Sequence, residues 1–385
     1  MLTYGIDASS ANKEQRTGVE WYAYHLIQQL KAQAVTLEDR IVLYAPQPLK
    51  GDLAVLPTFW ESRTLGWPFR KGWMQGRMSL EMLARPPNVF FVPSQALPRV
   101  HPGRFSRHRA TVTTLHDVGF RRFPDLYSAA ERRHLEVVTA FALRHTSAIF
   151  VPSEYTKSEL IELYRISSDR LVVTPLAADT ARYRSLPSFE IEPVLQRHRL
   201  GFKTYFLFIG RIETKKNVAT LIRAFELFKQ ARGFGDPFEL VLVGSAGFGF
   251  EEIKRYRDLS PVREAIRLPG WVEEADLPAL LNGATAYLFP SRYEGFGIPN
   301  LEALACGTPL VTSALPVHRE IVGPDAALFA AVTDPEAWAQ AMRQIVDEPR
   351  TAQDRAAAGL ERAKQYRWED TAAKTWEILR NSPSF

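Results

Sequence analysis

Two glutamates flank the start of one predicted helix. Of all the segments of this sequence, this one is the strongest candidate for a catalytic or binding site. A short apolar run, Ala284–Pro290, suits a buried strand, and a loop follows that holds Glu294 and Gly297. Pro299 then sits at a typical first helical position, and Glu302 lies in the first turn. The unpaired N–H groups of a helix N-terminus favour an anion such as phosphate.

Carboxylates beside a phosphate seat are poor phosphate ligands but good acceptors for the hydroxyls of a sugar or a ribose. Glu294 and Glu302 therefore indicate a nucleotide-sugar pocket. The alternative is that the glycine loop is an ordinary turn and that Glu302 only complements the helix dipole.

A second cluster of charges follows another buried strand, Tyr205–Gly210. Arg211 comes directly after the strand, and Lys215 and Lys216 precede a helix predicted from Ala219 to Ala231. The guanidinium fork of arginine and the ammonium of lysine both stabilise a departing phosphate. The alternative is a solvated loop.

The first half of the chain offers two further candidates. His116 and Asp117 end a strand predicted over 110–115, which is where α/β folds place ligands. Gly18 ends a polar loop after the first strand and precedes a helix over 19–30, so N–H groups there also point toward an anion. The alternatives are a structural histidine, an aspartate cap and an ordinary βα connection.

Strands and helices alternate along both halves of the chain, which is the doubly wound α/β pattern twice over. A length of 385 residues suits two domains. We predict a first domain over 1–185, a linker over 186–203 that contains prolines and charges but lacks periodicity, and a second domain over 204–369.

The composition is that of a soluble globular protein, with 46% hydrophobic and 24% charged residues. No run reaches the roughly 18 apolar residues of a membrane span, and the N-terminus does not resemble a signal peptide. The single cysteine, Cys306, excludes an internal disulfide and fits a reducing compartment, where we expect it to be a small packed residue. These features predict a cytoplasmic protein.

The first half is more basic than the second. Residues 1–185 hold 24 of the 48 Lys and Arg but only 17 of the 43 Asp and Glu. Within this half, Arg63–Arg85 alternates aromatic and basic residues, which suits the headgroup level of an anionic membrane. An amphipathic core helix with a solvated basic face is the alternative. More arginines follow between 99 and 122, but no nucleic-acid motif occurs, so nucleic acid is not expected as a partner.

Several segments resemble the retaining glycosyltransferases of family 4, which have the GT-B fold. The segment from Tyr293 to Val311, YEGFGIPNLEALACGTPLV, closely resembles the E-x7-E signature of that family. TGVEWYAYHL and GRIETKKN resemble the family's TG-x-E-x-Y and GR-x4-KN segments, and Gly270–Val272 resembles part of its LGWV segment. TLHDVGFRRFPDLY is similar to a segment found in many mannosyltransferases of the family.

This resemblance implies an α/β protein of GT-B fold, with two Rossmann-like domains facing an interdomain cleft and a last helix, 370–385, packing back on the first domain. It also implies roles for residues at matching positions. His116, Asp117 and Glu294 would hold the reacting sugar, and the donor diphosphate would be bound by Gly18, Arg211, Lys216, Phe296, Gly297 and Ile298. The ribose and base would be bound by Glu302 and by the backbone of Gly270, Trp271 and Val272.

The activity implied is transfer of a hexose from a nucleoside-diphosphate sugar with retention at the anomeric carbon. The sequence contains no Asp-x-Asp, so we expect no metal, and no cofactor besides the nucleotide sugar itself. The TLHDVGF segment favours GDP-mannose, with UDP-glucose and UDP-N-acetylglucosamine as alternatives. The basic first half favours a saccharide acceptor linked to a polyprenyl diphosphate, as in bacterial exopolysaccharide or O-antigen assembly, at the inner face of the membrane. A nucleotide-sugar epimerase and a non-catalytic subunit on the same scaffold stay open.

Overall fold

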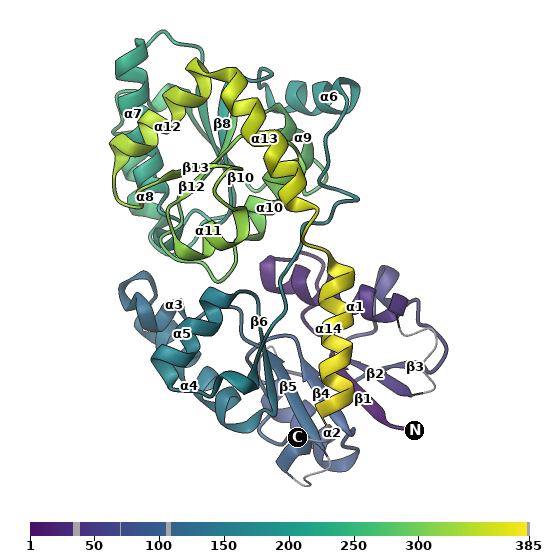
Figure 1. Cartoon of the computed structure of the whole chain (residues 1–385). Helices are drawn as coiled ribbons and strands as arrows, with labels where there is room; N and C mark the ends of the chain where they lie inside the picture. The colour runs from purple at the N-terminus through teal and green to yellow at the C-terminus, as the bar shows by residue number, and fades with distance from the viewer. Residues whose placement is uncertain (34–38, 70, 105–108, 383–385) are drawn as a thin grey trace. The chain divides into compact units, whose positions relative to one another are not determined.

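The chain forms two compact units. The computed structural model describes residues 1–33, 39–69, 71–104 and 109–382. Unit 1 comprises Met1–Arg122, Ala129–Leu176 and Arg367–Phe385, and unit 2 comprises Phe123–Ser128 and Ala177–Tyr366. Figure 1 shows that each unit is a sheet with helices packed on it.

Over the residues that the structure describes, unit 1 has a seven-stranded parallel sheet with the order β3-β2-β1-β4-β5-β6-β7. Its strands are β1 (Thr3–Asp7), β2 (Arg40–Ala45), β3 (Trp60–Thr64), β4 (Val89–Val92), β5 (Ala110–Thr114), β6 (Ala148–Val151) and β7 (Leu171–Val173). β4 and β6 are buried along their whole length, as parallel strands covered on both faces require. The strand order reverses between β1 and β4, which makes the sheet doubly wound.

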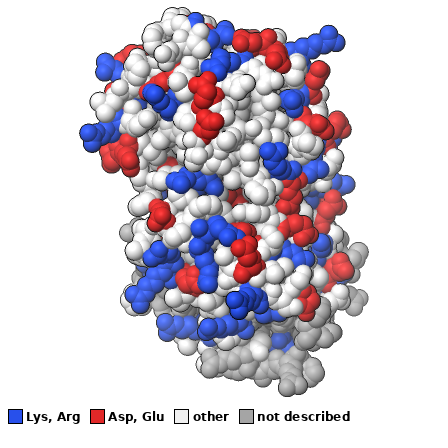
Figure 2. Space-filling model, turned by 60° about the vertical axis from the view of Figure 1, so that its left-hand side comes forward, with Lys and Arg blue, Asp and Glu red and all other residues white. Residues whose placement is uncertain are grey.

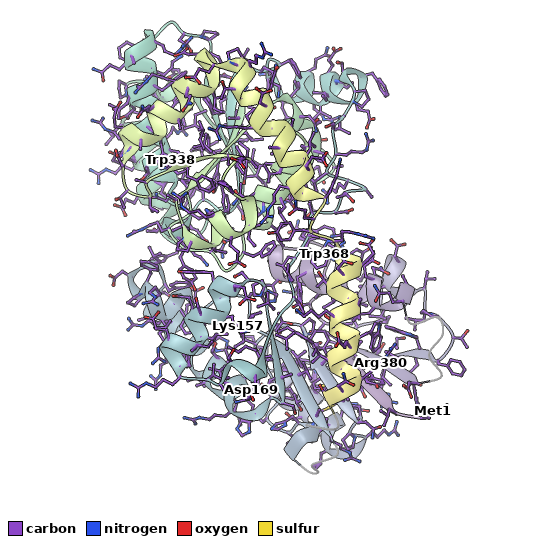
Figure 3. The ribbon with its side chains drawn as sticks, viewed as in Figure 1. Met1, Lys157, Asp169, Trp338, Trp368 and Arg380 are labelled. Carbon is purple, nitrogen blue, oxygen red and sulfur yellow. The ribbon has the colours of Figure 1, made fainter. Side chains whose placement is uncertain are left out.

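The helices of unit 1 include α14, which packs on α1 from the other end of the chain. Trp376 donates its indole N–H to the Leu30 carbonyl over 3.1 Å, and its ring meets Tyr4 edge-on at 5.7 Å. Trp368 stacks on His25 of α1, and Figure 3 labels it at the start of α14. The helices are α1 (Gly18–Gln33), α2 (Ser79–Ala84), α3 (Gly119–Arg122), α4 (Ala129–His145), α5 (Glu154–Tyr164) and α14 (Trp368–Asn381).

Unit 2 has, in its described residues, a six-stranded parallel sheet with the order β10-β9-β8-β11-β12-β13. Its strands are β8 (Tyr205–Ile209), β9 (Glu239–Val243), β10 (Ile266–Gly270), β11 (Ala286–Phe289), β12 (Leu310–Ser313) and β13 (Leu328–Ala330). The order reverses between β8 and β11, so the switch point of this sheet lies between these two strands. Ligands of open α/β sheets bind at such a point, outside the carboxyl ends of the strands.

Aromatic side chains fill the core between this sheet and helices α7 and α12. Phe206 of β8 contacts Phe225 and Phe228 of α7, and Trp338 of α12 (labelled in Figure 3) is fully buried with its indole N–H donated to the Ala331 carbonyl. The helices of unit 2 are α6 (Ser188–His198), α7 (Val218–Arg232), α8 (Phe250–Asp258), α9 (Leu277–Gly283), α10 (Ile298–Ala305), α11 (Pro316–Val322), α12 (Pro335–Asp347) and α13 (Pro349–Ala363).

The prediction of a linker over 186–203 is wrong, because these residues contain helix α6 and belong to unit 2. Pro187 immediately precedes the helix and Pro193 lies inside it. The prediction took both prolines and the surrounding charges as signs of irregular structure. Ile191 and Leu195 are buried, so tertiary packing stabilises a helix that the local sequence disfavours.

The boundaries of the units also differ from the predicted 1–185, 204–369 and 370–385. Unit 1 ends at Leu176, unit 2 resumes at Ala177, and the chain returns to unit 1 at Arg367. An ion pair within unit 2 agrees with this boundary: the guanidinium of Arg182 lies 3.2 Å from the Glu274 carboxylate.

The stretch Arg63–Arg85 is not a single amphipathic helix, so that alternative is wrong. It contains the end of β3, a loop, a π-helical turn over Met74–Met78 and the short helix α2. Arg63 and Arg77 both pair with the buried carboxylate of Glu81, at 2.8 and 3.0 Å. Two of the basic residues that suggested a membrane surface therefore form ion pairs within the fold. Arg70 lies outside the described residues, as does 105–108 in the arginine-rich run.

Candidate functional site

Two loops of unit 2 meet at the carboxyl ends of neighbouring strands. β8, β11 and β12 lie side by side in the sheet and run parallel, so the loops that follow them share one edge. The loop after β8 contains the cations predicted as a diphosphate clamp, and the loop after β11 contains Glu294 and leads into α10. The structure thus brings together, within one unit, residues some 80 positions apart in sequence.

Two hydrogen bonds hold these two loops against each other, and a third joins the cationic loop to Val332, which follows β13. Asn217 has a left-handed backbone, with φ of 57°, and its amide donates to the carbonyls of Pro290 and Val332 over 3.2 and 2.7 Å. The backbone N–H of Arg292 donates to the Lys215 carbonyl over 2.9 Å. The cationic loop is therefore fixed to the loop that carries Glu294.

An ion pair between Lys216 and Glu294 lies at the centre of this edge. Lys216 Nζ is 2.5 Å from Glu294 Oε1, and both side chains are less than one-fifth exposed. Burial acts to raise the pKa of Glu294, but the charges of Lys216 and Lys215 outweigh it and lower the pKa. Glu294 is thus an ionised acceptor, and the Lys216 ammonium has three N–H donors, of which this contact uses one.

The start of α10 is the helix N-terminus at which the sequence predicts an anion-binding site. Gly297 precedes the helix with φ of 93°, a conformation that L side chains rarely adopt. Among the described residues no side chain caps this end, and Pro299 has no N–H to offer. Phe296 is buried against Tyr366, with ring centroids 5.8 Å apart, while Ile298 is the first helical residue. Backbone N–H groups at this turn can therefore bind an anion beside Lys216.

Arg211 follows β8 and is the most exposed member of the predicted clamp. Its side chain is 55% exposed, and Nε lies 3.5 Å from the Glu213 carboxylate. Such a weak, solvated contact leaves the guanidinium able to turn toward a phosphate.

Glu302 has surroundings unlike those of Glu294. The pKa of Glu302 is raised to about 7: burial is the largest cause and the charges of Glu274 and Asp179 add to it, while Arg182 and a hydrogen bond from Tyr183 oppose the rise. The two glutamates do not pair with each other in the described structure. The carboxyl of Glu302 therefore changes its ionisation state close to neutral pH.

Cys306, one turn after Glu302, is buried, and burial together with Glu302 raises the pKa of its thiol. This agrees with the prediction of a small packed residue rather than a nucleophile.

Gly270, Trp271 and Val272 lie at the end of β10, two strands away from β8 at the same edge of the sheet. The Gly270 carbonyl accepts from the Gly244 N–H over 2.8 Å. Trp271 is 49% exposed, whereas Val272 is buried. The predicted base contact at this segment stays a prediction.

The candidates of unit 1 also lie at the carboxyl edge of their sheet. His116 follows β5, and its Nε2–H donates to the Pro93 carbonyl over 3.2 Å. Because a carbonyl only accepts, the lone pair of this neutral ring is on Nδ1. Burial lowers the pKa of His116, and Tyr22 of α1 contacts its ring at 4.7 Å. Asp117 accepts from the Gly119 N–H over 3.0 Å, as a turn cap does, and Gly18 is exposed as the first residue of α1.

Sequence reasoning missed four polar residues of this site in unit 2. Asn217 and Asn300 lie inside motifs that match the family but received no role. Tyr183 lies within 1–185, the range predicted as the first domain. His318, in α11, has no sequence signal, since a lone histidine in an apolar helix is usually structural. It is fully buried, and its ring lies 5.4 Å from Phe289 of β11.

No group of three or more His, Cys, Asp or Glu that could hold a metal ion occurs among the described residues. In the same residues, no helix is both long enough and apolar enough to cross a membrane.

Comparison with known proteins identifies the family. The family described as Glycosyl transferases group 1 matches residues 196–362, and Glycosyltransferase Family 4 matches residues 16–182. The O-antigen chain mannosyltransferase B of Escherichia coli is 33% identical over 276 residues, which are 71% of this chain and 71% of that protein. The chain belongs to the family 4 glycosyltransferases, as its motifs suggested.

More distant relatives have other activities. A glycogen synthase of Mycobacterium tuberculosis is 27% identical over 69% of this chain and 62% of its own length. A D-inositol 3-phosphate glycosyltransferase of Kineococcus radiotolerans is 30% identical over 59% of this chain and 55% of its own. The chain therefore spans little more than half of the length of this D-inositol 3-phosphate glycosyltransferase.

Solved structures confirm the GT-B fold. Anabaena HepE in complex with UDP and glucose matches with a TM-score of 0.75 at 16% identity, covering 99% of this chain and all of that one. WaaG, a glycosyltransferase involved in lipopolysaccharide biosynthesis, matches with a TM-score of 0.73 at 15% identity, covering 98% of this chain and 99% of that one.

Proposed function

We propose that this glycosyltransferase moves a hexose from a nucleoside-diphosphate sugar to a saccharide hydroxyl, with retention at the anomeric carbon. The observation that carries this proposal is the Lys216–Glu294 pair beside the uncapped N-terminus of α10. A cation and free backbone N–H groups suit a diphosphate, while an ionised carboxylate next to them suits the sugar hydroxyls.

In the proposed reaction the bond between the anomeric carbon and the diphosphate oxygen breaks, and a bond from the acceptor oxygen to that carbon forms. The acceptor hydroxyl gives its proton to the departing phosphate oxygen, and the nucleoside diphosphate leaves with the bonding electrons. Lys216, Arg211 and the α10 N-terminus stabilise the negative charge that develops on the leaving group. Glu294 holds hydroxyls of the hexose, Glu302 holds the ribose, and His116 with Asp117 contacts the sugar.

We propose GDP-mannose as the donor. Support comes from the TLHDVGF segment and from the 33% identity to an O-antigen chain mannosyltransferase. A role in O-antigen or another bacterial polysaccharide follows from the same relative. UDP-glucose and UDP-N-acetylglucosamine are the alternatives, because relatives of 27–30% identity bear other names.

We propose a lipid-linked acceptor, reached at the inner face of an anionic membrane. The support is the charge of the first half of the chain and the surface of unit 1. Figure 2 shows Lys and Arg at the surface with Asp and Glu among them, and Arg132, Arg133 and Arg144 of α4 are exposed. Phe69, which lies within Arg63–Arg85, is 66% exposed. Exposed aromatic and basic groups favour anionic headgroups.

A nucleotide panel tests the proposal. We expect GDP to raise Tm more than UDP, TDP or ADP at millimolar concentration, and GDP-mannose to be turned over with a saccharide acceptor. NMR of the product should show the anomeric configuration of the donor. Conversion of the donor without an acceptor would favour the epimerase, and nucleotide binding without turnover would favour the non-catalytic subunit. If no nucleotide shifts Tm, the transferase proposal fails.

A further inference from the structure

Buried polar groups without partners are concentrated beneath the Gly297 turn. Asn300 and His318 are both fully buried, and neither the Asn300 amide atoms nor His318 Nε2 have a hydrogen-bond partner among the described residues. A Cβ at Gly297 would lie 3.2 Å from Asn300 Nδ2 and 3.4 Å from His318 Nε2. The two nitrogens thus face the same point of the turn.

The other ring nitrogen of His318 is held in place, and this fixes the chemistry of Nε2. Nδ1 donates to the Ser313 carbonyl over 3.0 Å and lies 2.8 Å from the Thr312 hydroxyl. Because the carbonyl can only accept, Nδ1 carries the proton. Burial lowers the pKa of His318 to about 4, so the ring is neutral near pH 7. Nε2 is therefore a hydrogen-bond acceptor.

Asn300 can supply the donor that Nε2 lacks. Its amide nitrogen has two N–H groups, and its backbone N–H already donates to the Gly297 carbonyl over 3.0 Å, in the first turn of α10. An Asn300 N–H given to His318 Nε2, either directly or through one buried water, would provide both nitrogens with a partner. Such a link would connect α11 to the first turn of α10.

The same groups are adjacent to the charged pair. The ring centroid of Phe289 lies 5.2 Å from Lys216 Nζ and 5.4 Å from the His318 ring centroid. Phe289 therefore lies between Lys216 and His318 and contacts both.

Leaving buried polar groups unmatched costs about 1–3 kcal/mol for each group, and native proteins retain few of them. Two such side chains beside one functional turn therefore require an explanation. Polar groups that lower stability persist where function needs them.

We propose that Asn300 and His318 form a latch that holds the Gly297 turn, and with it the N–H groups of α10, in the conformation that binds the donor diphosphate. Both are positioning residues, acting through the turn rather than touching the donor. This inference rests on the proposed function, since it assumes a diphosphate at α10.

A pair of substitutions at His318 tests the latch. His318→Asn keeps an amide close to the position of Nδ1 and removes Nε2, whereas His318→Gln carries its amide out to the position of Nε2. Binding of GDP-mannose and of UDP-glucose is measured by calorimetry, and Tm is measured alongside. For whichever donor the wild type binds, we expect His318→Asn to raise Kd about tenfold, the scale of one buried hydrogen bond. The Kd of His318→Gln should stay within about threefold of the wild-type value.

A substitution at Asn300 separates binding from folding, because leucine has nearly the shape of asparagine. Asn300→Leu removes the N–H of the latch together with Oδ1, which has no partner among the described residues, so the two effects on stability oppose each other and we expect Tm to change little. Donor binding should nonetheless weaken about tenfold, with kcat at saturating donor changed less than KM.

Three results would overturn the latch. Wild-type donor affinity in Asn300→Leu is the first, and equal affinities in His318→Asn and His318→Gln, whatever their Tm, are the second. A fall in affinity that only accompanies a fall in Tm is the third, since it would indicate a purely structural role. Failure of the wild type to bind either donor would instead refute the proposed function on which the latch rests.

Discussion

The carboxyl edges of the two sheets carry different chemistry, although both sheets are parallel and doubly wound. The edge of unit 2 holds a buried ion pair, Lys216 with Glu294, next to a helix N-terminus. The edge of unit 1 holds His116, a histidine whose pKa is lowered by burial and whose one N–H is given to a backbone carbonyl. Unit 2 is thus suited to stabilising charge, whereas unit 1 offers a neutral ring and an aspartate.

This contrast makes a division of roles testable. If unit 2 binds the leaving diphosphate, changes there should alter nucleotide affinity and turnover together. If His116 contacts only the sugar, changes there should leave nucleotide affinity intact. The four predictions below are ordered by expected effect.

Lys216→Ala should have the largest effect. It removes a charge next to the leaving group and leaves Glu294 without its closest cation, so we expect turnover to fall at least about 10²-fold. Nucleoside-diphosphate affinity, measured by calorimetry, should fall as well. Lys215→Ala is the matched control and should reduce turnover much less, because Lys216 makes the hydrogen bond to Glu294. Unchanged kinetics in Lys216→Ala would remove this residue from the site.

His116→Ala should reduce turnover by about 10- to 100-fold, within the range for a lost positioned polar group. The Kd of the free nucleoside diphosphate should be within about twofold of the wild type, because unit 2 binds it. His116→Gln, which keeps an amide donor for the Pro93 carbonyl, controls for local folding. A large loss of nucleotide affinity in both variants would contradict the division of roles.

The pH dependence of nucleotide binding should report on Glu302, whose pKa burial raises to about 7. The ionised carboxylate is the better acceptor for ribose hydroxyls, so affinity should rise about tenfold between pH 6 and pH 8 as the group loses its proton. Folding stability should change in the opposite direction. A carboxyl whose folded pKa is raised stabilises the fold when protonated, so this contribution is lost as pH rises from about 4.5 toward 7. In Glu302→Gln both dependences should flatten, as calorimetry and thermal unfolding across pH would measure.

Tyr183→Phe should have the smallest effect. It removes the hydrogen bond that Tyr183 gives to Glu302 and that helps to keep the carboxyl ionised, so the pKa of Glu302 should rise further. Nucleotide affinity at pH 7 should fall by a factor of about two to five, and the difference should vanish above pH 9. A loss of affinity that is equal at pH 7 and pH 9 would show that Tyr183 acts by some other route.

Much of the fold could be predicted because buried parallel strands can be recognised from short apolar runs of sequence. Runs such as those of β4 and β11 are apolar throughout, and the helix starts near Gly297 and Ser153 follow capping and glycine rules. The helix α6 could not be predicted in this way. Pro193 inside it argues against a helix, whereas Pro187 only precedes it, and the burial of Ile191 and Leu195 against the rest of unit 2 overrides this preference.

The site residues likewise fall into those that local sequence motifs predict and those that only the tertiary structure brings into the site. Lys216, Glu294 and Gly297 lie in motifs of characteristic residue types, so their chemistry was readable from residue order alone. That Lys216 pairs with Glu294 and not with Glu302 depends on how β8 and β11 lie side by side, which no local pattern states. Tyr183 and His318 come from segments with no signal of their own, and proximity alone makes them part of the site.

The sequence by itself therefore determined the class of fold, the family and the residue types at the two loop starts, because these depend on local periodicity and on short motifs. Only the tertiary structure decided the ionisation of Glu294 and Glu302, since a pKa depends on burial and on charges brought from distant segments. The same holds for the unmatched pair Asn300 and His318, whose burial is a property of the packed core rather than of either residue.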